Sequence, residues 1–285
     1  MKLRAPAHFA SSEVNMSDTR PIRLWYQLLS SETRLRNSIA ATQAAADRVA
    51  APGTKVEVRG TSQGALGDQY RLFWHYDVRE VVDNGLSVRE RGGYDAFVIA
   101  NSLDPALTEL REILDIPVVS FMEVCCYTAC TMGERFALIA PNERFIPHYE
   151  DIVRSYGIEH RLSSTEAVRF DNIGRFDDVF TDDKVGDELL EQMKDACARA
   201  IARGAEVIIP AGPSAAFMVR RRIFEIDGVP ILDAYGLIVK AAEAAVAMHR
   251  ATGVCVSRKR RYQTPPRNLI LQCAQVRGIP ALRNG

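Results

Sequence analysis

Short apolar segments alternate with helix-type patterns along most of the chain, and this alternation constrains the fold more than any other feature. The segments 22–29, 96–101, 135–141 and 205–210 have the apolar and β-branched composition of buried strands, and an amphipathic stretch follows each of them. Strands that alternate with helices form mostly parallel sheets that are covered on both faces. We therefore predict an α/β fold.

The alternation restarts after Phe121, which divides the chain into two similar halves. YDAFVIANS at 94–102 and GAEVIIPAGPS at 204–214 are corresponding strand ends, and each comes after a long helix that ends in glycine. Such a repeat predicts two pseudo-symmetric lobes whose strand ends face each other across a cleft. We assign 20–118 plus 234–285 to the first lobe, 119–233 to the second lobe, and 1–19 to a flexible N-terminal extension.

The overall charge gives no reason to expect a polyanionic partner. The chain has 36 basic and 36 acidic residues, and its hydrophobic fraction of 47% suits a protein with sizeable cores. We therefore expect no binding to nucleic acid or membranes. The C-terminal segment 254–285 differs, because it carries seven Arg and Lys residues and no acid. We interpret it as a basic arm that contacts an acidic patch on the body or on a neighbouring subunit, and we expect a homo-oligomer.

The six cysteines indicate reduced thiols. They lie at 125, 126, 130, 197, 255 and 273 in a chain whose size does not require disulfides. No apolar run is long enough to span a bilayer, and no secretory signal is recognisable. The cysteines also lack the C-x-x-C pairs of zinc sites. We predict a cytoplasmic protein without a metal.

Four stretches carry a family resemblance. They are YDAFVIANSLDPALTELREILDIPVVSFMEV, GERFALIAPNERFIPHYEDIVRSYGI, ARGAEVIIPAGPSAAF and GVPILDAYGLIVKAAEAAVA. Together they resemble the aspartate/glutamate/hydantoin racemase superfamily, which includes arylmalonate decarboxylase and maleate isomerase relatives. The resemblance implies two flavodoxin-like lobes with parallel sheets, an interlobe active-site cleft and cofactor-independent chemistry. It also implies two catalytic cysteines, one at each strand-end turn, that serve as base and acid on opposite faces of a carbon acid.

This chain departs from that pattern at both cysteine positions. The first falls on Asn101 and the second on or near Gly212, and neither position holds a thiol, so a mechanism with two thiols is not available. The resemblance still implies a small carboxylate or cyclic amide (hydantoin-like) as substrate and a carbanion, enolate or oxyanion intermediate. Racemisation is the usual outcome in the family. The alternatives are a decarboxylase, lyase or hydrolase that uses a relocated Cys, Ser or Glu, and a non-catalytic protein that binds small acids.

The segment SFMEVCCYTAC offers the replacement groups for catalysis. We expect a helix to begin near Glu123, which places Cys125 and Cys126 in its first turns, where the helix dipole lowers the pKa of a thiol. The alternative is that both cysteines only pack the helix. Ser214, which we expect to cap the helix after Gly212, completes the catalytic candidates.

The candidates for substrate binding lie mainly at the expected strand ends. There, hydroxyl, amide and backbone N–H groups would hold a carboxylate or an enolate oxygen. His75 is included because it lies between two aromatic residues on a long helix. The set is Asn101, Ser102, Gly212, Pro213, Ser30, Asn142, His75 and Tyr235.

Overall fold

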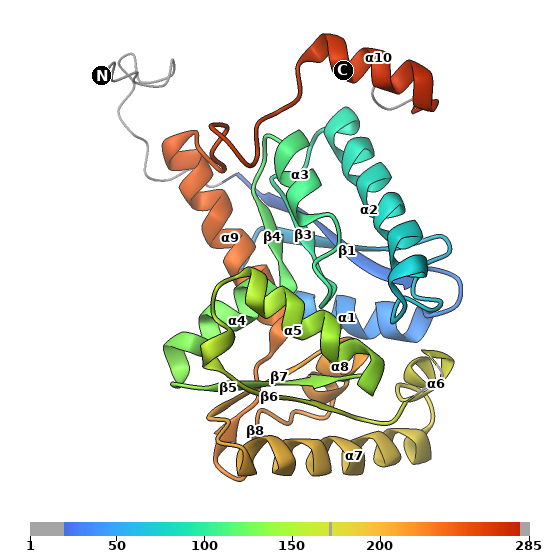
Figure 1. Ribbon diagram of the computed structural model, residues 1–285, viewed down its shortest axis with the longest axis vertical. Helices are drawn as coiled ribbons and strands as arrows, with labels where there is room; N and C mark the ends of the chain where they lie inside the picture. Colours follow the sequence, from blue (N-terminus) through green and yellow to red (C-terminus); the bar gives the residue numbers. More distant parts are fainter. Residues whose placement is uncertain (1–19, 171–172, 280–285) are drawn as a thin grey trace.

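The computed structural model describes residues 20–170 and 173–279, so the predicted extension 1–19 lies outside the described residues. The first half forms a four-stranded parallel sheet with the strand order β2-β1-β3-β4. Helices lie on both sides of this sheet (Figure 1). Its elements are β1 (Ile22–Ser31), α1 (Arg36–Val49), β2 (Thr54–Thr61), α2 (Arg71–Arg91), β3 (Ala96–Ile99), α3 (Leu107–Ile113) and β4 (Val118–Ser120).

The second half repeats this order of strands. Its sheet runs β6-β5-β7, and a parallel bridge between Ile208 and Ile231 places a further extended segment beside β7. The predicted α/β fold with two sets of parallel strands is therefore confirmed. Its elements are β5 (Phe136–Ala140), η1 (Glu143–Phe145), α5 (Ile146–Ser155), η2 (Glu159–Arg161), β6 (Leu162–Ala167), α6 (Ile173–Asp178), α7 (Asp183–Ala202), β7 (Val207–Pro210), α8 (Pro213–Arg220), β8 (Glu225–Ile226) and β9 (Val229–Pro230).

Two helices cross from one half to the other. Helix α4 (Phe121–Met132) follows β4 of the first sheet but packs on β5 and β7 of the second, whereas α9 (Ala234–Thr252) returns to pack on β1, β3 and β4. The two helices also pack against each other, which places one continuous apolar core between the lobes. The exact lobe boundaries stay a prediction, but this exchange ties the two sheets together through the core.

The basic arm begins after α9 and is held on the first half. The Arg258 guanidinium donates to the carbonyl groups of Arg111, Glu112 and Leu114, where α3 ends, and to the carboxylate of Asp115 at 2.9 Å. A cation is favourable there because the unpaired carbonyls of a helix C-terminus carry partial negative charge. The predicted contact with the body is therefore present, although most of the groups it meets are carbonyls rather than acids.

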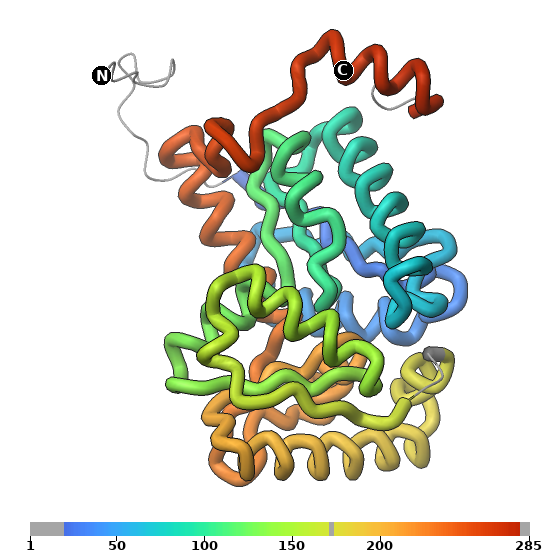
Figure 2. The backbone as a smooth tube through the Cα atoms, in the orientation of Figure 1, coloured from blue at the N-terminus to red at the C-terminus, as the bar shows by residue number. Residues whose placement is uncertain are grey.

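The described part of the arm includes α10 (Arg267–Arg277), which lies beyond the ends of α2 and α3 at the top of Figure 2. Leu269 is 46% exposed and Val276 is 81% exposed, and Ala274 is the helix's one buried residue. Apolar side chains on an exposed helix suit the predicted homo-oligomer, which stays a prediction.

Candidate functional site

The two strand-end turns that lack the family cysteines have different local structures. After β3, the Asn101 side-chain oxygen accepts a hydrogen bond from the Leu103 N–H at 2.9 Å and closes a tight turn. After β7, Gly212 takes φ 63° and ψ −149°, a combination that other residues rarely adopt, and serves as the N-cap of α8. One turn therefore presents a carboxamide, and the other presents only backbone.

Two tyrosines bring these turns together. Ser102, next to Asn101, shares a hydrogen bond of 2.8 Å with the Tyr149 hydroxyl on α5, and the Tyr235 hydroxyl on α9 donates to the Gly212 carbonyl at 3.4 Å. Burial raises the pKa of Tyr149, and its proximity to Tyr235 adds to this effect. Both phenols are therefore neutral hydrogen-bonding groups at ordinary pH. The turns of the two lobes meet at a shared, mostly buried junction.

A cavity of about 490 Å³ lies beside this junction and is lined by residues of both lobes, but not by the residues of the two hydrogen-bonded pairs themselves. Its wall includes Pro141, which lies next to Gly212: a Cβ added to Gly212 would lie 3.1 Å from the Pro141 ring. The Arg144 guanidinium lies 5.1 Å from the centre of the Tyr70 ring and joins the two lobes at the edge of the cavity. The lining is mainly apolar and aromatic: Leu66, Gly67, Gln69, Tyr70, Phe73, Pro141, Asn142, Phe145, Phe170 and Phe176.

A separate groove of about 540 Å³ runs between α2, α3, α4, α5 and the arm. It contains two of the predicted residues, His75 and Glu123. His75 is exposed, with its ring centre 4.9 Å from that of Trp74 and the two ring planes tilted by 59°, and the Glu123 carboxylate forms an ion pair with Arg111 at 2.6 Å. These two residues therefore lie in a different pocket from the cavity beside Pro141, in a groove that Leu103 and Asp104 of the β3 turn also line. Their roles in catalysis and binding stay predictions.

Asp104 holds the β3–α3 turn against α4 and α5. Its carboxylate accepts bonds from the N–H groups of Met122 and Glu123 at 2.9 and 3.0 Å, from the Ser120 hydroxyl at 3.0 Å, and from the Tyr156 hydroxyl. Burial raises the pKa of Asp104 to about 6, although these donors oppose the shift. The residue therefore caps α4 and joins the turn of one lobe to a helix of the other.

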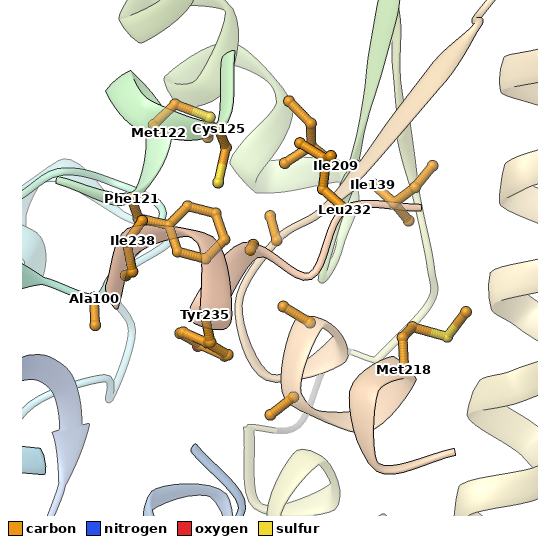
Figure 3. Close-up of a cluster of buried hydrophobic side chains, with 14 of the residues drawn as sticks. Ala100, Phe121, Met122, Cys125, Ile139, Ile209, Met218, Leu232, Tyr235 and Ile238 are labelled. Atoms are coloured by element: carbon orange, nitrogen blue, oxygen red, sulfur yellow. The ribbon is translucent and has the colours of Figure 1, made fainter. Parts of the chain in front are cut away.

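The expectation that the helix dipole lowers the pKa of Cys125 and Cys126 is wrong. Both side chains are fully buried, and burial raises the pKa of each thiol well above its ordinary value. Figure 3 shows Cys125 among Phe121, Met122 and Tyr235 in the apolar core between the lobes. The physical reason is that α4 crosses to the second lobe and packs the face that carries the thiols onto the second sheet. Catalysis by either thiol stays a prediction, and burial argues against it.

Thiol alkylation of the native protein tests this arrangement. We expect iodoacetamide to label Cys130, Cys255 and Cys273, which are partly exposed, and to leave Cys125 and Cys126 unlabelled until the protein is denatured. Peptide mass spectrometry after timed labelling measures this directly. Fast labelling of Cys126 in the folded protein, with loss of function, would instead support the hypothesis that a relocated cysteine is catalytic.

Four other predicted residues have the following positions. Ser30 lies within β1, which continues through Ser31, rather than in a turn. Asn142 caps η1 through its side-chain oxygen and lines the cavity. Pro213 is the first residue of α8, and Ser214 follows it with its hydroxyl donated to the Ala211 carbonyl at 2.7 Å, so the predicted serine cap is wrong and Gly212 is the cap.

Sequence reasoning missed three residues at the junction. Tyr149 is one of several apolar positions on an amphipathic helix and carries no signal of its own. Asp104 precedes a proline in the turn after a buried strand. That position could have indicated a carboxylate with a structural role. Asp68 lies in the loop between β2 and α2 and was not distinguishable from other loop acids.

The described residues contain neither a metal-binding cluster nor a helix that could span a membrane. In residues 20–170 and 173–279 no three His, Cys, Asp or Glu side chains come together as a metal-binding group. No helix in the same part of the chain has the length and apolar character needed to cross a membrane.

Comparisons with known proteins agree with this architecture. A family model described as Asp/Glu/Hydantoin racemase matches residues 32–242. A hydantoin racemase of Rhizobium meliloti is 31% identical over 163 residues, which are 57% of this chain and 65% of that protein, less than two thirds of its length. A hydantoin racemase of Paenarthrobacter aurescens is 27% identical over 233 residues, which are 80% of this chain and 94% of that protein.

One solved structure has the same fold over most of its length. The allantoin racemase of Pseudomonas fluorescens superposes with a TM-score of 0.73 at 22% sequence identity, covering 86% of this chain and 97% of that chain. At this level of identity the likeness shows the fold alone.

Proposed function

This chain belongs to the Asp/Glu/hydantoin racemase family, and on that basis we propose that it is an enzyme that binds a small cyclic amide or carboxylate at the interlobe junction. Breaking a bond to the carbon atom next to the substrate carbonyl would give an enolate or oxyanion. The observation that carries the proposal is that each of the β3 and β7 turns is hydrogen bonded to a tyrosine of the other lobe, through Ser102–Tyr149 and Tyr235–Gly212. The names of the relatives, hydantoin and allantoin racemases, favour a cyclic amide.

The groups available at the junction suit the binding of a substrate oxygen. The side-chain oxygen of Asn101 is used within its turn, so we assign its amide nitrogen as the donor to the oxygen that becomes negative. On the opposite side, the first turn of α8 provides backbone N–H groups, which favour negative charge. Arg144 at the cavity edge would attract an anionic substrate.

No thiol is available at either turn, so the proton cannot move between two cysteines. Asn101 and Gly212 occupy those positions, and the thiols nearest in sequence to the first turn, Cys125 and Cys126, are buried with raised pKa values. We therefore assign the proton transfer to an oxygen acid or base rather than to a thiol. The same observation favours a second candidate function, a protein that binds small cyclic amides or acids without turning them over.

Proton exchange distinguishes the two functions. The purified protein is incubated in D2O at pH 7 with single enantiomers of 5-benzylhydantoin, allantoin, aspartate and glutamate, and loss of the α-proton signal is followed by NMR against a sample without protein. We expect exchange with at least one cyclic amide. Binding in calorimetry without exchange would establish the binding protein instead, and neither binding nor exchange with any of the four would reject both.

A further inference from the structure

One buried acid at the junction has no structural explanation. Asp68 lies in the loop between β2 and α2, is 6% exposed, and its Oδ1 atom is buried with no hydrogen-bond partner in the described part of the chain. A carboxylate that is removed from water without full pairing costs several kcal/mol. Other buried acids here have clear roles, since Asp104 caps α4 and Asp177 caps the start of α1.

The loop places Asp68 directly behind the wall of the cavity beside Pro141, although Asp68 is not itself one of the lining residues. The residues on either side of it, Gly67 and Gln69, both line that cavity. Gly67 has φ 87°, and a Cβ there would lie 2.9 Å from the Phe73 ring, so the loop is folded tightly onto the start of α2. The charge of Asp68 also acts on the Tyr149 hydroxyl, which is bonded to Ser102. The carboxyl group therefore belongs to the same junction as Asn101.

Asp68 has no counter-charge among the groups that face it, although the backbone N–H groups of Asp68 and Gln69 donate to its carboxylate and lower its pKa. From α2 it faces Asp77, whose carboxylate accepts from the Ala65 N–H at 3.2 Å, and from α5 it faces the neutral Tyr149. His148 on α5 interacts with the Gln69 backbone rather than with the carboxylate, and burial lowers its pKa, which keeps it neutral. Burial and the charge of Asp77 together raise the pKa of Asp68 to about 7.

We propose that Asp68 is the proton-transfer group of the interlobe site, acting on a carbon acid such as a 5-substituted cyclic amide. This inference rests on the proposed function. The carboxylate oxygen takes the proton from the carbon next to the carbonyl, and the C–H electron pair moves onto the carbonyl oxygen to give an enolate near Asn101. The neutral carboxylic acid then returns a proton to the same carbon, so no oxidant, reductant or further reactant is needed.

A single acid on one side has a consequence for stereochemistry. Inversion needs a second proton donor on the opposite face of the planar intermediate, and the β7 turn cannot supply it from position 212, because glycine has no side chain. A group that removes and returns the proton on one face exchanges it with solvent while keeping the configuration. We therefore expect deuterium incorporation to be faster than loss of optical activity.

Replacement of Asp68 by asparagine is the central test, with 5-benzylhydantoin as the probe. The amide keeps the size of the side chain but cannot transfer a proton in this way. We expect the D68N rate of deuterium exchange to fall at least 100-fold, with probe affinity in calorimetry changed by less than about 3-fold. The wild-type rate should rise with pH to an inflection near 7 because the carboxylate is the active form of the base, and D68N should lack this inflection.

A control variant and a measurement without substrate complete the test. D83N makes the same chemical change on α2 at a half-exposed position, and we expect it to exchange at the wild-type rate.

Because the pKa of Asp68 is raised on folding, its contribution to stability is present below pH 4 and is lost as the pH rises towards 7. Denaturation from pH 4 to 8 should show this loss in wild type and not in D68N.

The possible failures are distinguishable. If wild type exchanges the probe and D68N does so at a similar rate, the inference about Asp68 is wrong while the proposed function stands. If wild type neither binds nor exchanges any of the four compounds, the proposed function is wrong and this inference with it. If the stability of wild type and D68N depends on pH in the same way, Asp68 does not titrate as a buried carboxyl group and the inference is overturned.

Discussion

Replacement of Asp104 by alanine is expected to lower the free energy of unfolding by about 4 kcal/mol. The carboxylate accepts bonds from Ser120, Met122, Glu123 and Tyr156, and each buried donor left without a partner costs roughly 1 to 3 kcal/mol. The backbone of Asp104 is also left-handed, with φ 45°, which aspartate and asparagine tolerate better than alanine. Urea denaturation followed by circular dichroism measures the change.

Two further variants separate the cap from a general loss of packing. The asparagine of D104N keeps a side-chain oxygen that accepts hydrogen bonds, and asparagine also tolerates a positive φ. We therefore expect D104N to lose about half as much stability as D104A. D195A makes the same change at an exposed position of α7 and should stay within about 0.5 kcal/mol of wild type. A D104A protein as stable as D195A would show that the carboxylate does not hold the junction together.

The pH dependence of Asp104 has a defined sign. Its pKa is raised on folding from an ordinary value near 4 to about 6, so the folded state binds the proton more tightly in that range. The stability that this group contributes is present below pH 4 and is lost as the pH rises through 6. In D104N this part of the pH dependence should disappear, which the same denaturation experiment detects at pH 4 and pH 7.

Replacement of Gly212 by alanine is expected to destabilise the protein by about 2 kcal/mol and to weaken probe binding more than 10-fold. The φ of 63° and ψ of −149° form a combination that costs non-glycine residues roughly 1 to 3 kcal/mol. The added Cβ would also press on Pro141 in the cavity wall, and relief of that contact moves the carbonyl that Tyr235 binds. Calorimetry with 5-benzylhydantoin and urea denaturation measure the two effects.

Gly157 provides the matched control. It has φ 73° with no heavy atom within 4 Å of an added Cβ, and it lies after α5 rather than at the cavity. We expect G157A to cost about 1 kcal/mol and to bind the probe as wild type does. Equal binding by G212A and wild type would mean that the β7 turn is not part of the site. The same backbone strain applies to G212C, so the second family thiol cannot be restored without a change in the turn.

Local patterns in the sequence predicted the fold well. Runs such as FVIAN and EVIIP are apolar on both sides, as strands buried between two layers of helices must be, and the restart after Phe121 gave the two sheets. The positions of Asn101 and Gly212 after β3 and β7 were also predictable, because a strand end is a local property. Their resemblance to family cysteine positions then indicated where a site should lie.

The chemical environment of the candidate site was not predictable in the same way. The pattern around Cys125 and Cys126 indicates a helix but not which sheet that helix covers, and the exchange of α4 decides that both thiols are buried. The contacts of Tyr149 with Ser102 and of Tyr235 with Gly212 join residues far apart in the chain. Asp68 gave no signal, because burial alone makes it differ from other loop acids.

The sequence by itself determined the strand and helix order, the two-lobe plan and the absence of a thiol at both turns, since these depend on side-chain type and short-range periodicity. Only the tertiary structure decided which groups share the junction and which are charged there. The physical reason is that a pKa depends on desolvation and on neighbouring charges, and both are set by segments that meet only when the chain is folded.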